Sequence, residues 1–348
     1  MDKTKEKILL IKLSSMGDVI FCVPLANALK NWGYEVHWLV GEKGYDIINN
    51  NPCVEKAILV PIQKWRKDRF NIENLKEAWG ILKQIRAEKY DIAIDAQMMF
   101  KSFLWMLFCG AKRRITSKKA KELTALCGTE WVENISYKPD CPIVLNYLKY
   151  AQHLGIPLDK AGVSLPKRSD AQIAKVDELL KDLDPKKPTV VIAPATTWDY
   201  KHWSVNNWKK VAANLSQDCN LVFTNGTSKC ELIDEIRNGK GFNLAGKTDV
   251  LELLELFSRA DVVISPDSGS ANLAWLTGKP AVVTIFTCTP KEILAPLGNS
   301  NKYIALGGEG LPCQPCFKRK CKLKKNKGAC INFPNPKDVI DVVHTLIF

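Results

Sequence analysis

The chain has 348 residues, 46% of them apolar, which is enough for buried cores in two domains. Lysine and arginine exceed aspartate and glutamate by 50 − 37 = 13, which favours an anionic partner: nucleic acid, a phosphate-bearing substrate or an acidic membrane surface. The sequence has no apolar run of about 18 residues, which excludes a transmembrane helix. The charged start MDKTKEK leads directly into a strand, so we expect a cytosolic chain without a signal peptide, its twelve cysteines mostly reduced.

The first motif is ILLIKLSSMGDVIFCVPLANALK, residues 8–30. Ile8 to Leu13 predicts a buried parallel strand, Ser14 to Gly17 a tight turn, and Asp18 the opening of a helix. A strand, a loop and a helix N-terminus place free N–H groups at the carboxyl edge of a sheet. Asp18 has two interpretations there: a helix cap, or a general base held at the sheet edge.

The rest of the first half alternates strands with helices. The pattern predicts strands at residues 35–40, 57–60 and 90–95 and a helix at 72–87. Such alternation indicates an α/β fold with a parallel, doubly wound sheet.

Two segments of the first half carry unusual side chains. PIQKWRKDRF, residues 61–70, is predicted to be a loop in which Lys64, Arg66, Lys67 and Arg69 surround Trp65. It is either a solvated loop or a site for phosphate or carboxylate groups. FLWMLFC, residues 103–109, is predicted to be an internal helix, with a membrane-facing patch beside basic residues as the alternative.

The second half repeats the pattern after a linker expected near residues 160–170. It predicts strands at residues 189–193, 221–224, 261–265 and 281–285, with helices at 204–215, 229–237, 250–259, 270–277 and 336–348.

Two motifs of the second half offer anion-binding groups. PATTWDYKHWSVNNW, residues 194–208, holds Thr196, Thr197 and Lys201 after a strand, and a turn with a solvated lysine is the alternative. In DVVISPDSGSANLAW, residues 261–275, Gly269 lets a phosphate approach a helix N-terminus. Asp267 or Ser268 would cap that helix, and capping is compatible with anion binding.

Together these motifs resemble those of the ADP-heptose lipopolysaccharide heptosyltransferases of glycosyltransferase family 9. The matching segments are SSMGDVIFCVPLANALK, DAQMMFKS, TTWDYKHW and DSGSAN, and the resemblance is greatest to the branch that adds the first heptose. It implies a GT-B fold: two Rossmann-like, doubly wound domains facing a central cleft. The chain departs from the family pattern at Met98, where glycine is usual, and at Asn272, where histidine is usual and where an amide cannot titrate.

The resemblance also implies roles for individual residues. Asp18 would be the catalytic base, and Lys201 would stabilise the departing diphosphate. The donor would be bound by Met16, Gly17, Thr196, Thr197, Lys201, Asp267, Ser268, Gly269 and Asn272. The acidic acceptor would be bound by Lys64, Arg66, Lys67 and Lys121.

The implied organisation is an acceptor-binding domain over residues 1–165 and a nucleotide-sugar domain over 166–335, with the helix at 336–348 packing back on the first domain. The implied reaction moves heptose, with inversion, from ADP-L-glycero-D-manno-heptose to the Kdo region of a lipid A precursor, without a cofactor. The implied enzyme is a monomer, peripheral on the cytoplasmic face of the inner membrane and attracted by its anionic surface.

Two alternatives stay open. The chain could be a transferase of the same fold that uses another nucleotide-sugar or acceptor, such as the second or third heptosyltransferase. It could also be a non-catalytic nucleotide- or nucleic-acid-binding protein. We expect no nucleic-acid partner, because the sequence has no RNA-binding aromatic motif and no helix-turn-helix signature.

Cysteines cluster near the C-terminus, at Cys313, Cys316, Cys321 and Cys330. Four thiols in so short a segment could hold a structural zinc ion. The second pair is too widely spaced for a compact zinc knuckle, and similar cysteine tails occur in the resembling family, whose chemistry is metal-independent. We therefore expect no metal. The basic loop over residues 318–327 is expected to be solvated or to face an anion.

Overall fold

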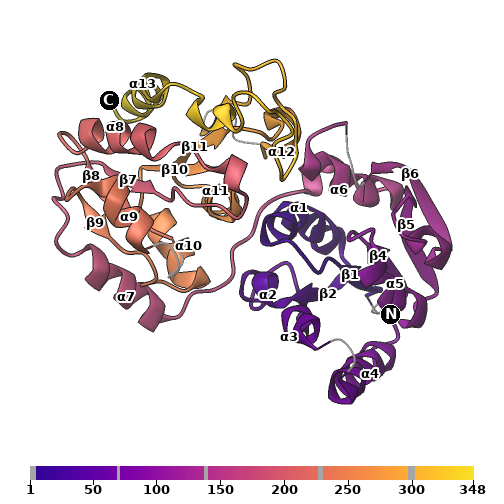
Figure 1. Cartoon of the computed structure of the whole chain (residues 1–348). Helices are drawn as coiled ribbons and strands as arrows, with labels where there is room; N and C mark the ends of the chain where they lie inside the picture. Colours follow the sequence, from indigo (N-terminus) through magenta and orange to yellow (C-terminus); the bar gives the residue numbers. More distant parts are fainter. Residues whose placement is uncertain (1–4, 69–70, 137–139, 226–229, 297–301) are drawn as a thin grey trace. The chain divides into compact units, whose positions relative to one another are not determined.

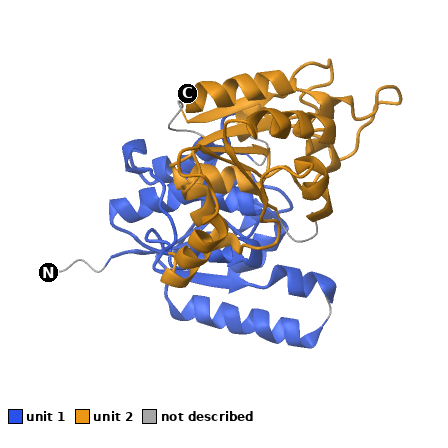
Figure 2. Cartoon of the chain, turned by 90° about the vertical axis from the view of Figure 1, so that its left-hand side faces the viewer, with its two compact units in different colours: residues 1–167 blue, residues 168–348 orange. Residues whose placement is uncertain are grey.

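The computed structural model describes residues 5–68, 71–136, 140–225, 230–296 and 302–348. The chain forms two compact units, residues 1–167 and residues 168–348, coloured separately in Figure 2. The division lies inside the segment where the sequence predicts a linker. Each unit is an α/β sandwich around its own sheet, as Figure 1 shows.

The N-terminal unit has a six-stranded parallel sheet in the order β3-β2-β1-β4-β5-β6. Its strands are β1 (Lys7–Ile11), β2 (Glu35–Gly41), β3 (Lys56–Val60), β4 (Ile92–Asp95), β5 (Arg113–Lys119) and β6 (Glu130–Ser136). β1 pairs with both β2 and β4, so the winding direction reverses between β1 and β4. In an open α/β sheet, ligands bind where the carboxyl ends of two such strands diverge.

Helices cover both faces of this sheet. They are α1 (Met16–Trp32), α2 (Glu42–Ile48), α3 (Ile62–Lys67), α4 (Ile72–Ala87), α5 (Phe100–Phe108) and α6 (Ile143–His153), with 3₁₀ turns η1 (Thr124–Cys127) and η2 (Leu158–Lys160). Helix α1 begins at Met16 with Ser15 as its N-cap, two positions before the predicted start at Asp18. It ends at Gly33, whose φ of 110° is a conformation that glycine adopts without cost.

Three parts of this unit differ from the sequence-based expectation. The segment predicted as a basic loop contains helix α3 over Ile62–Lys67, and Arg69 lies outside the described residues. Strands β5 and β6 were not predicted, because their apolar residues are few and irregularly spaced. Helix α5 is not internal: it buries Trp105 and Met106 but leaves other apolar side chains exposed.

The C-terminal unit repeats the architecture in the order β12-β11-β10-β7-β8-β9, with all pairs parallel. Its strands are β7 (Thr189–Ile192), β8 (Asn220–Phe223), β9 (Phe242–Asn243), β10 (Val262–Pro266), β11 (Ala281–Phe286) and β12 (Tyr303–Gly307). The winding reverses between β7 and β10. The sequence predicts the four inner strands, whereas the edge strands β9 and β12 are short or only half-buried and give weak patterns.

Its helices include the predicted ones. They are α7 (Asp170–Leu180), α8 (Val205–Leu215), α9 (Cys230–Arg237), α10 (Val250–Ser258), α11 (Gly269–Thr277), α12 (Lys291–Leu294) and α13 (Pro336–Ile347), with 3₁₀ turns η3 (Asp199–Lys201) and η5 (Ala329–Asn332). The predicted start of α9 at Lys229 lies outside the described residues. Among the described helices, none combines the length and apolar character that a bilayer span requires.

The final helix corrects one expectation. The sequence predicts a helix that packs back on the first domain, but α13 belongs to the C-terminal unit and packs against α8. Val339 and Val343 on α13 are fully buried in the same core as Trp208 of α8. The apolar face of α13 is therefore satisfied within its own unit.

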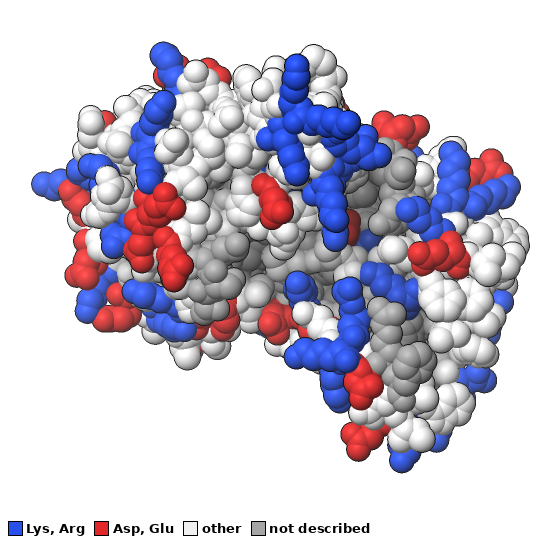
Figure 3. All heavy atoms as spheres, in the orientation of Figure 1, with Lys and Arg blue, Asp and Glu red and all other residues white. Residues whose placement is uncertain are grey.

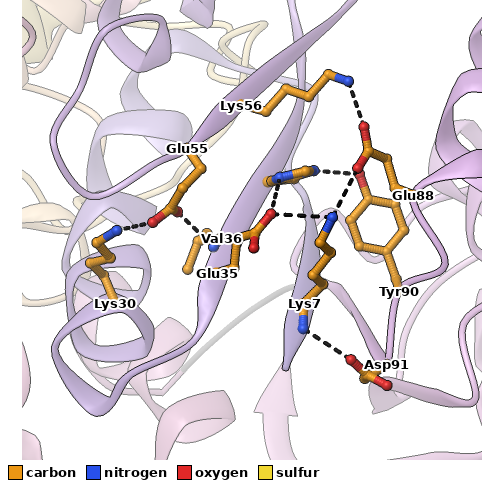
Figure 4. Close-up of polar contacts among 10 residues, drawn as sticks. Lys7, Lys30, Glu35, Val36, Glu55, Lys56, Glu88, Tyr90 and Asp91 are labelled. Atoms are coloured by element: carbon orange, nitrogen blue, oxygen red, sulfur yellow. Dashed lines mark hydrogen bonds and ion pairs between the residues drawn. The ribbon is translucent and has the colours of Figure 1, made fainter. Parts of the chain in front are cut away.

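A polar cluster fixes the amino ends of the first four strands (Figure 4). His37 on β2 is 4% exposed, and its ring nitrogens lie 2.8 Å from the Tyr90 hydroxyl and 3.0 Å from Glu35 Oε1. Burial lowers the pKa of His37, which favours the neutral ring. Lys7 on β1 lies between Glu35 and Glu88, at 3.3 and 3.2 Å. These contacts hold the sheet at the edge opposite to the loops at the carboxyl ends of its strands.

The position of α13 yields a stability prediction. Val343→Ala removes two buried methyl groups and leaves a cavity, so the C-terminal unit should lose about 2 kcal/mol of unfolding free energy. The matched control is Thr345→Ala, which makes the same shape change at an exposed position of α13 and should cost within about 0.5 kcal/mol. Urea unfolding checks this, and equal midpoints for the two variants would contradict the packing of α13 into this core.

Candidate active site

The loops after β1 and β4 are joined by hydrogen bonds where the sheet reverses direction. Gln97 Oε1 accepts hydrogen bonds from the backbone N–H groups of Leu13 and Ser14, at 3.0 and 2.9 Å. Asp95 Oδ1 in turn accepts from the backbone of Gln97 and Met98, both at 3.0 Å. One buried amide therefore fixes the loop that carries Ser14 to Gly17.

Met98 shows why glycine is usual at its position. Its φ is 56°, in the left-handed region, and its carbonyl accepts a hydrogen bond from the backbone of Lys121 at 3.1 Å. Methionine in this conformation costs about 1 kcal/mol more than glycine. The substitution therefore keeps the glycine-type turn.

Asp18 combines both interpretations that the sequence leaves open. It is the third residue of α1, and its Oδ2 accepts from the Ser15 backbone N–H at 3.0 Å and from Ser15 Oγ at 2.9 Å. These bonds form a capping box. Oδ1 has a different partner, the Tyr147 hydroxyl at 3.5 Å, a distance too long for a strong hydrogen bond. One oxygen thus holds the helix, and the other retains a lone pair for a proton.

The charge state of Asp18 is set by its neighbours. Burial by itself raises the pKa of Asp18, but the positive charge of Lys12 and the hydrogen bonds from Ser15 outweigh it, so the pKa lies below its ordinary value. Lys12 is 3% exposed on the strand side of the loop, with Nζ 3.2 Å from the Ala96 carbonyl and 4.8 Å from the Tyr147 ring centroid. Asp18 is therefore a carboxylate at neutral pH.

A second lysine lies on the other side of the loop. Lys101 on α5 donates a hydrogen bond to Ser14 Oγ. Burial and the positive charges of Lys12 and Arg66 lower the pKa of Lys101 to about 8, although Asp18 opposes the shift. The carboxylate of Asp18 thus lies in a field of cations, which suits an acidic ligand.

The expected acceptor-binding residues are only partly gathered. The positive charge of Arg66 lies close enough to Lys101 to lower its pKa. The backbone N–H of Lys121 donates to the carbonyl of Met98. Lys64 is instead paired with Glu77 at 2.9 Å, and Lys67 is exposed at the end of α3. Trp65 stacks on Trp105 at 6.3 Å between ring centroids, which anchors α3 to the core.

In the C-terminal unit the equivalent position is the N-terminus of α11. Ser268 is its cap, with Oγ accepting from Ser270 N at 3.2 Å and lying 2.9 Å from Ser265 Oγ. Gly269 begins the helix, whose first N–H groups and dipole favour an anion. Asn272 is buried one turn further along the same helix, and its backbone N–H donates to the Ser268 carbonyl at 3.3 Å.

Lys201 lies beside this N-terminus in an ion pair. Its Nζ is 2.5 Å from Asp267 Oδ2, and the two side chains are 15% and 8% exposed. Thr289 Oγ1 donates to the same carboxylate oxygen at 2.8 Å. The sequence-based expectation assigns Asp267 to the diphosphate, and in the structure its carboxylate contacts Lys201 and Thr289. Asp267 therefore holds Lys201 beside the N-terminus of α11.

Thr196 and Thr197 precede η3, half-buried and exposed respectively. Between them and Lys201 lies Trp198, whose ring centroid is 4.9 Å from Lys201 Nζ and 5.0 Å from Arg319. Phe317 stacks on the same ring at 5.9 Å. The cysteine-rich loop therefore packs against the segment that carries Lys201.

The predicted cysteine cluster lines one small cavity in the C-terminal unit. Cys288 joins Cys313, Cys316, Cys321 and Cys330 around a space of about 20 Å³, room for one water molecule. Burial raises the pKa of Cys330 to about 11. Within the described ranges, no three His, Cys, Asp or Glu side chains are arranged to hold a metal ion. Lys and Arg side chains gather over the loop that follows β12 in Figure 3.

Sequence reasoning missed four residues that shape the first site: Lys12, Gln97, Lys101 and Tyr147. Lys12 gave a signal, because it interrupts an otherwise apolar strand. Tyr147 gave none, since it lies on α6, more than a hundred residues from Asp18. The N-terminal unit offers a carboxylate with a free lone pair among cations, and the C-terminal unit offers a lysine beside a helix N-terminus. Such groups can remove a proton from an acidic acceptor and bind a phosphate-bearing donor.

Comparisons with known proteins identify relatives of this chain. Lipopolysaccharide heptosyltransferase 1 of Pseudomonas aeruginosa is 26% identical over 98% of both chains. The structure of a family 9 glycosyl transferase from Veillonella parvula superposes with a TM-score of 0.83 at 18% identity, covering 100% of this chain and 98% of that one. Escherichia coli heptosyltransferase WaaC with ADP-2-deoxy-2-fluoro heptose has a TM-score of 0.72 at 21% identity, covering 97% and 99%. These structures confirm the predicted GT-B fold.

A family model described as glycosyltransferase family 9 (heptosyltransferase) matches residues 78–327. The match spans more than half of the chain and includes strands of both units. The chain therefore belongs to glycosyltransferase family 9 and is a glycosyltransferase.

Proposed function

We propose that this enzyme transfers heptose, with inversion, from ADP-L-glycero-D-manno-heptose to the Kdo region of a lipid A precursor. The observation that carries the proposal is the Asp18 carboxylate, held by a capping box through Oδ2 and surrounded by cations. Support for the substrates comes from the relative in Pseudomonas aeruginosa, which is named lipopolysaccharide heptosyltransferase 1. Support for the donor also comes from the structure of WaaC with an ADP-heptose analogue.

In the proposed reaction, Asp18 Oδ1 takes the proton of the acceptor hydroxyl as that oxygen attacks the anomeric carbon. The bond from that carbon to the diphosphate breaks, and ADP leaves. The N-terminus of α11 and Lys201 stabilise the negative charge that grows on the diphosphate. Thr196, Thr197, Met16, Gly17 and Asn272 are proposed as further donor contacts.

The acceptor is proposed to bind at the N-terminal unit. Kdo carries a carboxylate, and Lys101 with Arg66 offers positive charge beside Asp18. Lys64, Lys67 and Lys121 are proposed as further contacts for the acidic groups of the acceptor. We propose a monomer that works at the anionic surface of the inner membrane on its cytoplasmic face.

The donor and the step can be tested together. The enzyme is incubated with ADP-heptose or with UDP- and GDP-sugars, and with Kdo-lipid A or the same lipid already carrying one heptose. Mass spectrometry reads the product. Transfer only from ADP-heptose to the unheptosylated lipid supports the proposal. Transfer only to the heptosylated lipid would assign the second step, and transfer from another nucleotide-sugar would overturn the donor.

Asp18→Asn separates the capping role from the catalytic one. An amide oxygen can still accept the Ser15 N–H bond, so the protein should melt nearly normally and bind ADP. It cannot take a proton at neutral pH, so turnover should fall by roughly 10²–10⁴-fold.

The control is Ser15→Ala, which removes a cap hydroxyl but keeps the carboxylate. It should cost about 1 kcal/mol of stability and little turnover. Near-normal turnover in a stable Asp18→Asn enzyme would leave Asp18 as a helix cap alone.

Lys101 yields a pH prediction. Because its pKa is lowered to about 8, the side chain is a cation below that pH and loses its charge above it. With an acidic acceptor, kcat/KM should fall as the pH rises through about 8, since this ratio reports the free enzyme. Lys101→Arg stays charged and should abolish the fall in kcat/KM, whereas Lys101→Met should have a low kcat/KM at every pH. A Lys101→Arg profile identical to that of the wild type would exclude Lys101 as an acceptor contact.

Lys201 requires a paired variant, because removing it leaves the buried Asp267 carboxylate without its partner. The double variant Lys201→Ala/Asp267→Asn removes both charges and should recover most of the melting temperature lost in Lys201→Ala. ADP affinity should fall by roughly 10- to 100-fold in both, the equivalent of one charge-assisted contact. Calorimetric titration with ADP measures this, and wild-type affinity in the double variant would exclude the phosphate contact.

A further inference from the structure

The outer face of α5 is apolar and exposed. Phe100, Leu104, Leu107 and Phe108 are 56%, 52%, 39% and 44% exposed, while Trp105 on the opposite face is buried. A helix at the surface of a globular protein usually carries polar residues on its outer face. α5 instead presents apolar side chains on both faces.

The apolar area continues onto the elements beside α5. On α4, Ile72, Leu75 and Trp79 recur on one face and are 66%, 62% and 57% exposed. Arg86 of α4 donates to the Phe108 carbonyl at 3.4 Å, which places the two helices side by side.

On the other side of α5, η1 contacts the helix through Cys127 Sγ, which lies 3.5 Å from the Phe103 carbonyl, and it exposes Leu123 and Leu126 at 68% and 73%. The α4–α5–η1 surface is the set Ile72, Leu75, Trp79, Phe100, Leu104, Leu107, Phe108, Leu123 and Leu126. So large an apolar set is expected on a protein that docks to another body.

Basic side chains lie along this surface. Lys76, Lys83 and Arg86 fall on the same side of α4 as its exposed apolar residues. Lys83 Nζ lies 5.8 Å from the Trp79 ring centroid. Glu77 of α4 is turned to α3, where it accepts from Lys64 and Trp65. Two other acids lie at the margin, Glu73 in the first turn of α4 and Glu122, which accepts from the Phe100 N–H at 2.8 Å. The three basic residues of α4 outnumber these two acids, so the edge of the apolar area is net positive.

We infer that the α4–α5–η1 surface docks the N-terminal unit onto an anionic lipid membrane. Apolar and aromatic side chains would enter the boundary between headgroups and acyl chains, and the lysines would meet anionic headgroups. A second copy of the chain fits less well, because two such surfaces would bring like charges together. The inference rests on the proposed function, since a lipid-linked acceptor gives the enzyme its reason to bind a membrane.

The same helix connects the surface to the candidate base. α5 has nine residues and spans about 13 Å. Near its N-terminus Lys101 contacts Ser14, which is four residues from Asp18 and beside Ser15 of the capping box, while Phe108 ends the exposed face. An acceptor whose acyl chains stay in the bilayer could thus present its sugar to Asp18 without leaving the membrane.

The test is flotation with vesicles of phosphatidylethanolamine, with or without phosphatidylglycerol, in the absence of donor and acceptor. Leu104→Gln/Leu107→Gln should lower partitioning by roughly 10- to 100-fold, as expected when two leucines no longer enter the interface. Lys76→Glu/Lys83→Glu should lower binding to the anionic vesicles by about fivefold or more for each charge and should not change binding to the neutral ones. The matched control is Leu158→Gln/Val163→Gln, which alters residues 42% and 45% exposed elsewhere in the same unit and should bind like the wild type.

Equal binding by Leu104→Gln/Leu107→Gln and its control, with unchanged melting temperatures, would overturn the inference. A wild-type dimer in sedimentation that the same variant dissociates would assign the surface to a second copy instead. Activity separates this result from the proposed function: the leucine variant should raise KM for Kdo-lipid A in vesicles and leave KM for a deacylated acceptor unchanged. A wild-type enzyme that transfers to neither acceptor would refute the proposed function while the vesicle result stands.

Discussion

A buried lysine sets the electrostatics of the N-terminal unit. Lys12 extends an apolar strand into the interior, where an uncompensated ammonium would be very unfavourable. Its compensation comes from the Ala96 carbonyl, the face of Tyr147 and the charge of Asp18. The charge of Lys12, with the hydrogen bonds from Ser15, keeps the pKa of Asp18 low despite its burial. Burial, with the charge of Lys12, lowers the pKa of Lys101 to about 8. One strand residue thus contributes to the protonation of two groups on neighbouring elements.

In the C-terminal unit the charges are reversed, in the segments that follow β7 and β10 where the winding of the sheet reverses. There the buried group is a carboxylate, Asp267, and its compensation is Lys201. In the N-terminal unit the cation Lys12 is buried and Asp18 is half-buried, whereas in the C-terminal unit the anion Asp267 is buried and Lys201 is slightly more exposed. This asymmetry matches a division of labour in which one unit removes a proton and the other stabilises a leaving phosphate.

Much of the fold could be predicted because its inner strands are continuous apolar runs between helical patterns. β1, β4, β7 and β10, the four strands at the two reversal points, were all predicted. The strands that escaped prediction lie toward sheet edges, where half-burial weakens the pattern, as in β5 with its sequence RRITSKK. The sequence assigned α13 to the wrong unit, because an amphipathic pattern indicates that one face of a helix is buried but does not indicate which element covers that face.

The candidate site was predictable only where its residues follow a strand. Asp18 and Lys201 do, and sequence reasoning reached both. Tyr147, Gln97 and Lys101 act on the first site from α6 and from the loop and helix after β4, and their contacts depend on how those elements pack. The family resemblance identified candidate site residues but not the side chains that they contact. Asp267, for example, was assigned to the donor, and in the structure its carboxylate contacts Lys201 and Thr289.

The two departures from the family pattern become intelligible in these terms. Met98 adopts the left-handed backbone conformation that glycine would adopt, at a cost of about 1 kcal/mol. Two hydrogen bonds hold the turn and offset this cost: the Met98 N–H donates to Asp95, and the Lys121 N–H donates to the Met98 carbonyl. Asn272 lies within α11, and its backbone N–H is already bonded to the Ser268 carbonyl. An amide there can donate a hydrogen bond but cannot exchange a proton. In the N-terminal unit, by contrast, the charge of Lys12 favours an ionised carboxylate at Asp18 of α1.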